Sequence, residues 1–189
     1  PFVYAEKGKT AVGGKYAVIH SKRQIPHDWV GRSWQEDRYE QIAKRLHSEG
    51  YRVVVVGGPN DMTVSTFDWD LRGQTSLNEL SWVVQNASLF VGMDSMPMHL
   101  AMIHNTPGVA FFGCILPEKR LIGDSLIPVN AKHLDCIGCH HGQPAPTHGT
   151  SGCRRGDQAC QTEVSVDEMW DAVVRAMRKP KRYTLPVIA

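Results

Sequence analysis

The sequence lacks any apolar run close to the roughly 20 residues that cross a membrane as a helix, and no signal peptide is visible. Its formal net charge is only +2, which gives no support to general nucleic-acid binding. Internal repeats and long runs of like charge are also missing. These absences argue against a membrane-spanning protein, a repeat array or a nucleic-acid-binding protein. We therefore expect neither a transmembrane segment nor a nucleic-acid partner.

What is present suits one domain, because 189 residues with 42% hydrophobic content can bury a proper core. Short apolar runs predict strands at 16–19, 53–56, 88–92 and 108–112. Apolar periodicity and end signals predict helices at about 35–48, 77–86 and 97–104, and a last helix beginning at 166. Alternating strands and helices are typical of a doubly wound parallel sheet, so the predicted fold class is α/β and Rossmann-like.

Two predicted helices carry the same start signal, a serine followed three residues later by a glutamate. Ser76 with Glu79, and Ser165 with Glu168, have the spacing of a capping box. The last helix then presents one apolar stripe, which we interpret as core packing. Its members are Val166, Met169, Trp170, Val173 and Met177.

The segment 89–101 reads as a buried strand that ends abruptly in the opening of a helix. Leu89 to Val91 form a short apolar run, Gly92 permits the turn, and Pro97 suits a helix's first turn. The free amides and positive dipole end of such a helix face the carboxyl edge of the sheet, where open α/β sheets bind phosphates. The alternative is an ordinary turn in which Asp94 or Ser95 merely caps the helix.

Charged residues follow the first two predicted strands as well. Lys22, Arg23 and Arg32 come after the first strand and form a cationic group that two phosphates could meet. Asp61 follows the second strand, where Pro59 and Asn60 also fit a simple turn. Solvated loop residues are the alternative interpretation of each.

Four segments resemble, in order, the motifs of glycosyltransferase family 9, the heptosyltransferases. Residues 94–101, DSMPMHLA, are similar to the family's DSGPMHLA, and residues 105–113, NTPGVAFFG, to its GTPxVALFG. Upstream, residues 70–80, DLRGQTSLNEL, resemble DLxGxTSLxEL, and residues 31–34, GRSW, resemble the KxW element. Met96 departs from the pattern, because the family has a glycine there beside the expected pyrophosphate.

The resemblance implies the GT-B architecture of two facing Rossmann-like domains, of which residues 1–189 would be the second, nucleotide-sugar-binding one. The chain begins at Pro1 without an initiator methionine, which we interpret as an excised C-terminal half lacking an N-terminal acceptor-binding domain. Arg32 takes the place of the family lysine that meets the phosphates, and an arginine keeps that charge. The candidate donor-binding residues are Arg32, Lys22, Asp61, Asp94, Ser95, Met96 and His99, where Lys22 is suggested by its place after the first strand and Met96 contributes its backbone amide.

The activity that this resemblance implies is inverting transfer of a heptose-like sugar from an ADP-sugar to an acceptor hydroxyl. The catalytic base would come from the other domain, so we expect no catalytic residue in this chain and no turnover by it alone. A cytoplasmic location fits this chemistry. Two other functions stay open: a sugar-nucleotide epimerase of the same architecture, and a non-catalytic nucleotide-binding or scaffold module.

A second feature is the clustering of four of the five cysteines in a glycine-rich stretch, 133–162. Cys136, Cys139, Cys153 and Cys160 have a spacing that could deliver four thiolates to one structural zinc or iron ion. In the family branch that modifies autotransporters, the resemblance implies iron. Two disulfides are the alternative. Cys114 lies outside this stretch and is expected to be a lone core residue.

Overall fold

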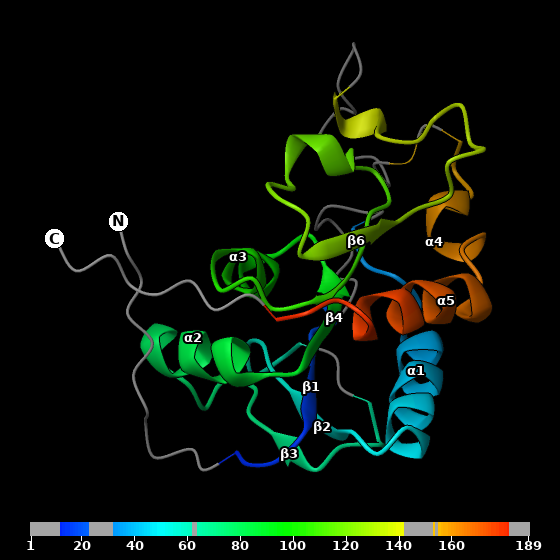
Figure 1. Ribbon diagram of the computed structural model, residues 1–189. Coiled ribbons are helices and arrows are strands. Elements are labelled where there is room, and N and C mark those ends of the chain that lie inside the picture. Colours follow the sequence, from blue (N-terminus) through cyan, green and yellow to red (C-terminus); the bar gives the residue numbers. More distant parts are fainter. Residues whose placement is uncertain (1–11, 23–31, 62–63, 142–152, 154, 182–189) are drawn as a thin grey trace, which may run out of the picture.

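The computed structural model describes residues 12–22, 32–61, 64–141, 153 and 155–181 (Figure 1). The strands are β1 (Tyr16–Ile19), β2 (Arg52–Val55), β3 (Trp69–Asp70), β4 (Leu89–Met93), β5 (Gly108–Phe111) and β6 (Leu126–Val129). The helices are α1 (Glu36–Ser48), α2 (Leu77–Asn86), α3 (Met96–Ile103), α4 (Ala159–Thr162) and α5 (Val166–Met177). Two short 3₁₀ helices, η1 (Pro117–Lys119) and η2 (Cys139–His141), complete the described elements.

The six strands form one parallel sheet in the order β3-β2-β1-β4-β5-β6. From β1 the chain adds β2 and β3 on one side of the sheet. It then crosses back to form β4 on the other side of β1, followed by β5 and β6. β1 and β4 are therefore neighbours, with Ile19 paired to Val91. Open α/β sheets bind ligands at such a reversal of strand order, outside the carboxyl ends of the strands.

Helices cover both faces of this sheet, with α1 and α5 on one side and α2 and α3 on the other (Figure 1). Alternate residues of each strand point to opposite faces, so Ile19 packs in the α1–α5 core while Val18 packs in the α2–α3 core. Both side chains are completely buried. The prediction of a doubly wound α/β fold is confirmed.

The helix starts follow the sequence signals closely. Ser76 accepts a hydrogen bond from the Glu79 amide at 3.3 Å, and the Glu79 carboxylate accepts one from the Ser76 amide at 2.8 Å. Ser165 and Glu168 repeat this arrangement on α5. Both predicted capping boxes are confirmed, and the stripe on α5 packs against the core as expected.

The sequence patterns missed the two outermost strands, β3 and β6. β3 has two residues, which is too short for an alternating pattern to show. β6 contains Pro128, which lacks the N–H that a central strand needs. Its place at the edge of the sheet tolerates this loss, because only one side of an edge strand is paired.

Candidate functional site

The carboxyl edge of β4 presents a buried carboxylate held between two arginines. Asp94 directly follows β4, and its side chain is only 3% exposed. Arg32 Nη2 donates to the Asp94 backbone oxygen at 2.7 Å and to Oδ2 at 3.3 Å. Arg120 Nε donates to the same Oδ2 at 3.3 Å, and His99 Nε2 lies 3.9 Å from Oδ1. The predicted residues Arg32, Asp94 and His99 therefore come together.

Arg120 is a member of this cluster that the sequence analysis did not identify. It follows η1 in the loop between β5 and β6 and contacts Asp94. Arg32 precedes Asp94 along the chain, whereas Arg120 follows it. The side chains of Arg120 and Arg32 are 34% and 28% exposed, so each is partly open to solvent while one end of it contacts Asp94. The only sequence signal was a basic pair, Lys119 and Arg120, after a predicted strand.

A second set of polar side chains connects β4 to β1 and β2. His20 directly follows β1, and its amide continues the ladder by donating to the Val91 oxygen at 3.0 Å. Its Nδ1 lies 2.9 Å from Ser95 Oγ, and its Nε2 lies 3.5 Å from Asp61 Oδ2. Ser95 and Asp61 were predicted site residues. The histidine that links them was not among the predicted site residues.

Asp61 is fixed by the turn that follows β2. Its Oδ2 accepts a hydrogen bond from the Gly58 amide at 2.7 Å. A Cβ on Gly57, whose φ is +143°, would lie 2.6 Å from that oxygen, so only glycine fits there. Burial raises the pKa of Asp61, but the hydrogen bonds from His20 and Gly58, together with the charges of His20 and Lys22, hold it below its usual value.

Lys22 is held at the same edge through its backbone. The Ser33 hydroxyl donates to the Lys22 oxygen at 2.7 Å and lies 3.4 Å from the Lys22 amide. The Lys22 charge acts on Asp61, which places both on the β1–β2 side of the site. Arg23 lies outside the described residues.

The first turn of α3 opens toward these residues. Ser95 is the N-cap residue, but its side chain makes no capping hydrogen bond and turns to His20 instead. The amides of the first helical turn therefore keep the anion-binding character of a helix N-terminus. Met96, which stands in place of the family glycine, is 50% exposed. Its side chain projects from the start of α3 instead of packing into the sheet.

The four cysteines of 133–162 gather without forming a metal site. In the described part of the chain, which includes all four thiols, no three His, Cys, Asp or Glu side chains are placed to hold one metal ion. Cys139 packs against the α2–α3 core, whereas Cys136 and Cys160 pack against the α1–α5 core. The predicted four-cysteine ion site is therefore not supported by the described residues.

All five cysteines are free thiols, so the alternative of two disulfides is not formed either. Burial, followed by the charges of Cys139, Cys153 and Cys136, raises the pKa of Cys160 to about 12. Cys114 is buried as expected, but it is not isolated. Burial and then the charges of Cys139 and Cys160 raise its pKa to about 12, while the charge of Arg32 acts in the opposite direction.

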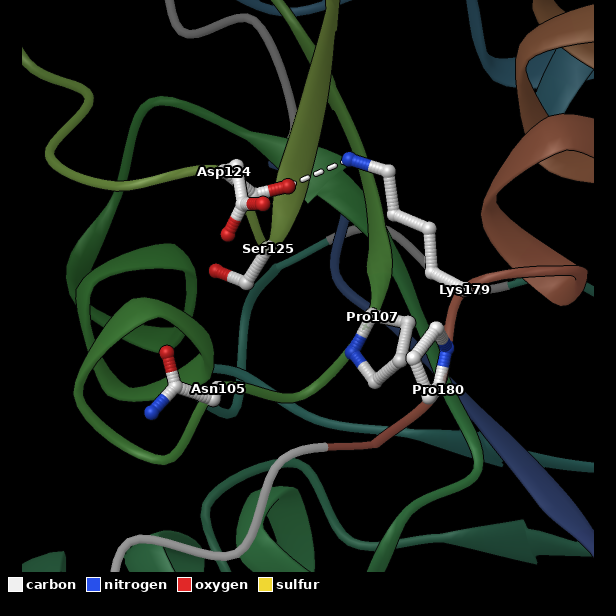
Figure 2. A pocket seen from close by; sticks show the side chains of 6 residues that line it. All are labelled: Asn105, Pro107, Asp124, Ser125, Lys179 and Pro180. Carbon is white, nitrogen blue, oxygen red and sulfur yellow. Dashed lines mark hydrogen bonds between the residues drawn. The ribbon is translucent and has the colours of Figure 1, made fainter.

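Two surface pockets lie away from this edge. Figure 2 shows one of about 140 Å³ between Pro107, Ser125 and Lys179. Pro107 and Ser125 directly precede β5 and β6, so this pocket lies at the amino ends of the strands. The second, of about 720 Å³, lies between β6 and α5. Neither contains a predicted site residue, and neither is the candidate site.

A six-stranded parallel sheet covered by helices on both faces, with its strand order reversing between β1 and β4, defines a Rossmann-like α/β domain. Residues 6–145 match glycosyltransferase family 9 (heptosyltransferase), and the chain belongs to this family. It is 30% identical over 120 residues to lipopolysaccharide heptosyltransferase 3 of Escherichia coli, covering 57% of this chain and 34% of that protein. It is also 30% identical over 97 residues to lipooligosaccharide heptosyltransferase 2 of Haemophilus influenzae, covering 45% and 28%.

Solved structures share the fold at lower identity. The iron-containing dodecameric heptosyltransferase TibC of E. coli, in complex with ADP-D-β-D-heptose, superposes with a TM-score of 0.76 at 18% identity. That match covers 93% of this chain and 48% of TibC. The E. coli ADP-heptose lipopolysaccharide heptosyltransferase II gives a TM-score of 0.63 at 16% identity, covering 86% and 46%. This chain thus spans about a third to a half of these relatives. Among the described residues, no helix is long and apolar enough to cross a membrane.

Proposed function

We propose that this chain is the nucleotide-sugar-binding half of an inverting glycosyltransferase that takes a heptose-like sugar from an ADP-sugar. The observation that carries the proposal is the opening of α3 beside Asp94, with Arg32 and Arg120 on either side. A helix N-terminus and two guanidinium groups form a site for a dianionic or trianionic diphosphate. The ADP-heptose complex of TibC, which has the same fold, supports the choice of ligand.

In this proposal each residue has a defined task. Arg32 and the first-turn amides of α3 bind the diphosphate and stabilise the charge that grows on it as the bond to the sugar breaks. Asp94 holds Arg32 and Arg120 in place, because its buried carboxylate accepts from both. Asp61, on the β2 side, is placed to accept from ribose hydroxyls. His99, which is 45% exposed, is free to reach the sugar or a phosphate.

The remaining parts of the reaction belong outside the site. The acceptor hydroxyl must attack the anomeric carbon from the face opposite the leaving diphosphate, and a base must remove its proton. We assign both the acceptor site and the base to an N-terminal domain. The share of the relatives that this chain covers, about a third to a half, supports this assignment. This scheme gives no task to a metal ion, since among the described residues no His, Cys, Asp or Glu side chains are grouped to hold one.

Calorimetry with ADP tests the proposal directly. We expect the chain to bind ADP weakly, because one wall of a two-walled cleft makes only part of the contacts. Arg32→Ala should lose roughly 1.5 to 3 kcal/mol of binding free energy, as expected for a hydrogen bond to a charged group. Arg175→Ala, on the exposed face of α5, is the matched control and should bind like the wild type. Equal affinity in all three proteins would remove Arg32 from the site.

A further inference from the structure

The side chain of His20 is enclosed between the phosphate side and the ribose side of the site. The residue is only 4% exposed. A Cβ on Gly57 would lie 3.2 Å from its Cδ2, and a Cβ on Gly92 would lie 3.1 Å from its backbone oxygen. Side chains at these glycines would crowd the histidine. The ring is therefore held in a fitted space, with Nδ1 toward Ser95 and Nε2 toward Asp61.

The protons available to these groups restrict their hydrogen bonds. Ser95 Oγ lies 2.9 Å from His20 Nδ1 and 3.0 Å from the Met93 oxygen, but the hydroxyl has only one proton to donate. The Asp61 carboxylate only accepts, so Nε2 must carry a proton to bond with it. In the neutral tautomer with its proton on Nδ1, the lone pair of Nε2 would face a lone pair of the Asp61 carboxylate, which is unfavourable. That leaves two favourable states.

In the neutral state, Nε2–H donates to Asp61 and Nδ1 is an acceptor. The Ser95 hydroxyl then donates to Nδ1, so its proton is committed to the ring. In the protonated state, both ring nitrogens donate, one to Asp61 and the other to Ser95 Oγ. The Ser95 proton is then released to the Met93 oxygen or to an anion at the start of α3.

We propose that His20 is a positioning residue that couples diphosphate binding at the α3 N-terminus to the uptake of a proton by its own ring. The inference rests on the proposed function, because it needs a diphosphate beside Ser95. A bound diphosphate favours the state in which Ser95 can donate to it, and that state is the imidazolium. Linkage is reciprocal, so a lower pH must then strengthen diphosphate binding.

The charges around the ring fit this coupling. Asp61 faces Nε2 at 3.5 Å, so Nε2–H can donate to it in both favourable states of the ring. A bound diphosphate would add negative charge on the Ser95 side, which favours the imidazolium. Among the described residues, the other charged or titratable groups near this edge include Lys22, Arg32, Asp70, Arg72, Asp94, His99 and Arg120.

Calorimetry of ADP binding in buffers with different ionisation enthalpies measures the proton uptake. We expect the wild type to take up to one more proton per ADP than His20→Gln, which keeps a polar side chain but does not titrate. The dissociation constant of the wild type should rise about three- to tenfold more than that of the variant between pH 6 and pH 8. Proton uptake by the ADP phosphates and by every other group is common to both proteins, so the difference belongs to His20.

Two further variants and one spectroscopic readout separate this coupling from a structural role. Ser95→Ala should lose most of the extra uptake even though His20 is intact, because no hydroxyl proton remains to be redirected and only the charge of the diphosphate still favours the imidazolium. His47→Gln, an exposed histidine paired with Asp68, should keep it. In the wild type, nitrogen NMR of the imidazoles should show the pKa of His20 rising when ADP is added.

The outcomes are distinct. ADP binding with the same uptake in the wild type and His20→Gln would overturn the coupling and leave the proposed function intact. Full uptake in Ser95→Ala would show that Ser95 is not the link. If the wild type binds neither ADP nor inorganic pyrophosphate, the proposed function fails and this inference fails with it. Should His20→Gln not fold, Ser95→Ala and the NMR titration still decide the question.

Discussion

The sheet edge beside β1 and β4 and the cysteine-rich stretch 133–162 were both predicted as sites, but among the described residues only the first forms the expected cluster of polar contacts. At the sheet edge, Arg32 contacts Asp94 and His20 contacts Ser95, residues that lie 62 and 75 positions apart. In the cysteine-rich stretch, Arg155 pairs with Asp157, two positions away, and the Gln158 amide lies 3.4 Å from Cys153 Sγ, five away.

The difference teaches which kind of spacing carries structural information. Residues that directly follow parallel strands are brought to one edge, because every strand ends there. Cysteines spaced along an irregular stretch share no such frame. Gly138 and Gly156 have positive φ angles and turn the backbone of this stretch. The placement of its cysteines therefore depends on the core residues that they contact.

The largest expected effect comes from disrupting the parallel sheet between β4 and β5. A Cβ on Gly108 would lie 2.3 Å from the Phe90 backbone oxygen, so Gly108→Ala must push β5 away from β4. We expect a loss of up to about 3 kcal/mol in the free energy of unfolding, as in other overpacked cores. Urea denaturation measures it. Gly13→Ala, where a Cβ would meet nothing within 4 Å, is the matched control and should be close to neutral.

An intermediate effect should follow from removing one arginine in each region. Arg120→Ala removes a hydrogen bond to the buried Asp94 and should weaken ADP binding about tenfold, since a charge-assisted hydrogen bond is worth roughly 1.5 kcal/mol or more. Arg155→Ala removes an exposed pair with Asp157 and should change ADP affinity less than twofold. Calorimetry on both variants makes the comparison. Similar losses in the two would mean that the regions are not separate.

The smallest expected effect concerns the cysteine-rich stretch. Cys153→Ser should change the free energy of unfolding by less than about 0.5 kcal/mol, because the partly exposed thiol makes one weak contact with the Gln158 amide. A loss of several kcal/mol would instead identify Cys153 as a ligand of a structural ion.

A thiol count under denaturing conditions accompanies that measurement. All five cysteines are free in the structure, so five thiols should react without a reductant or a chelator. A single reactive thiol would indicate two disulfides. A chelator needed to expose the remaining four would indicate a bound ion that rearranges this stretch.

The sequence alone determined the parallel α/β fold and the helix starts, and it predicted most residues that meet in the candidate site. Strand β1 was predicted residue for residue, and both capping boxes formed, because hydrophobic period and cap chemistry are local properties. Arg32, Asp94, Ser95 and His99 were found because they follow strands or lie in a family motif that fixes their place along the chain. Their convergence then follows from parallel strand geometry.

Only the tertiary structure decided which residues complete that site and what the cysteines do. Arg120 reaches Asp94 through a loop after β5 that has no pattern of its own, and His20 links Ser95 to Asp61 because β1 pairs with β4 in one register. Cys139 and Cys160 pack against different cores, although their spacing suggested a shared ion. Local sequence determines whether a segment forms a helix or a strand and where that element begins and ends. Contacts between distant segments are set by how the elements pack, and no spacing along an irregular segment encodes that.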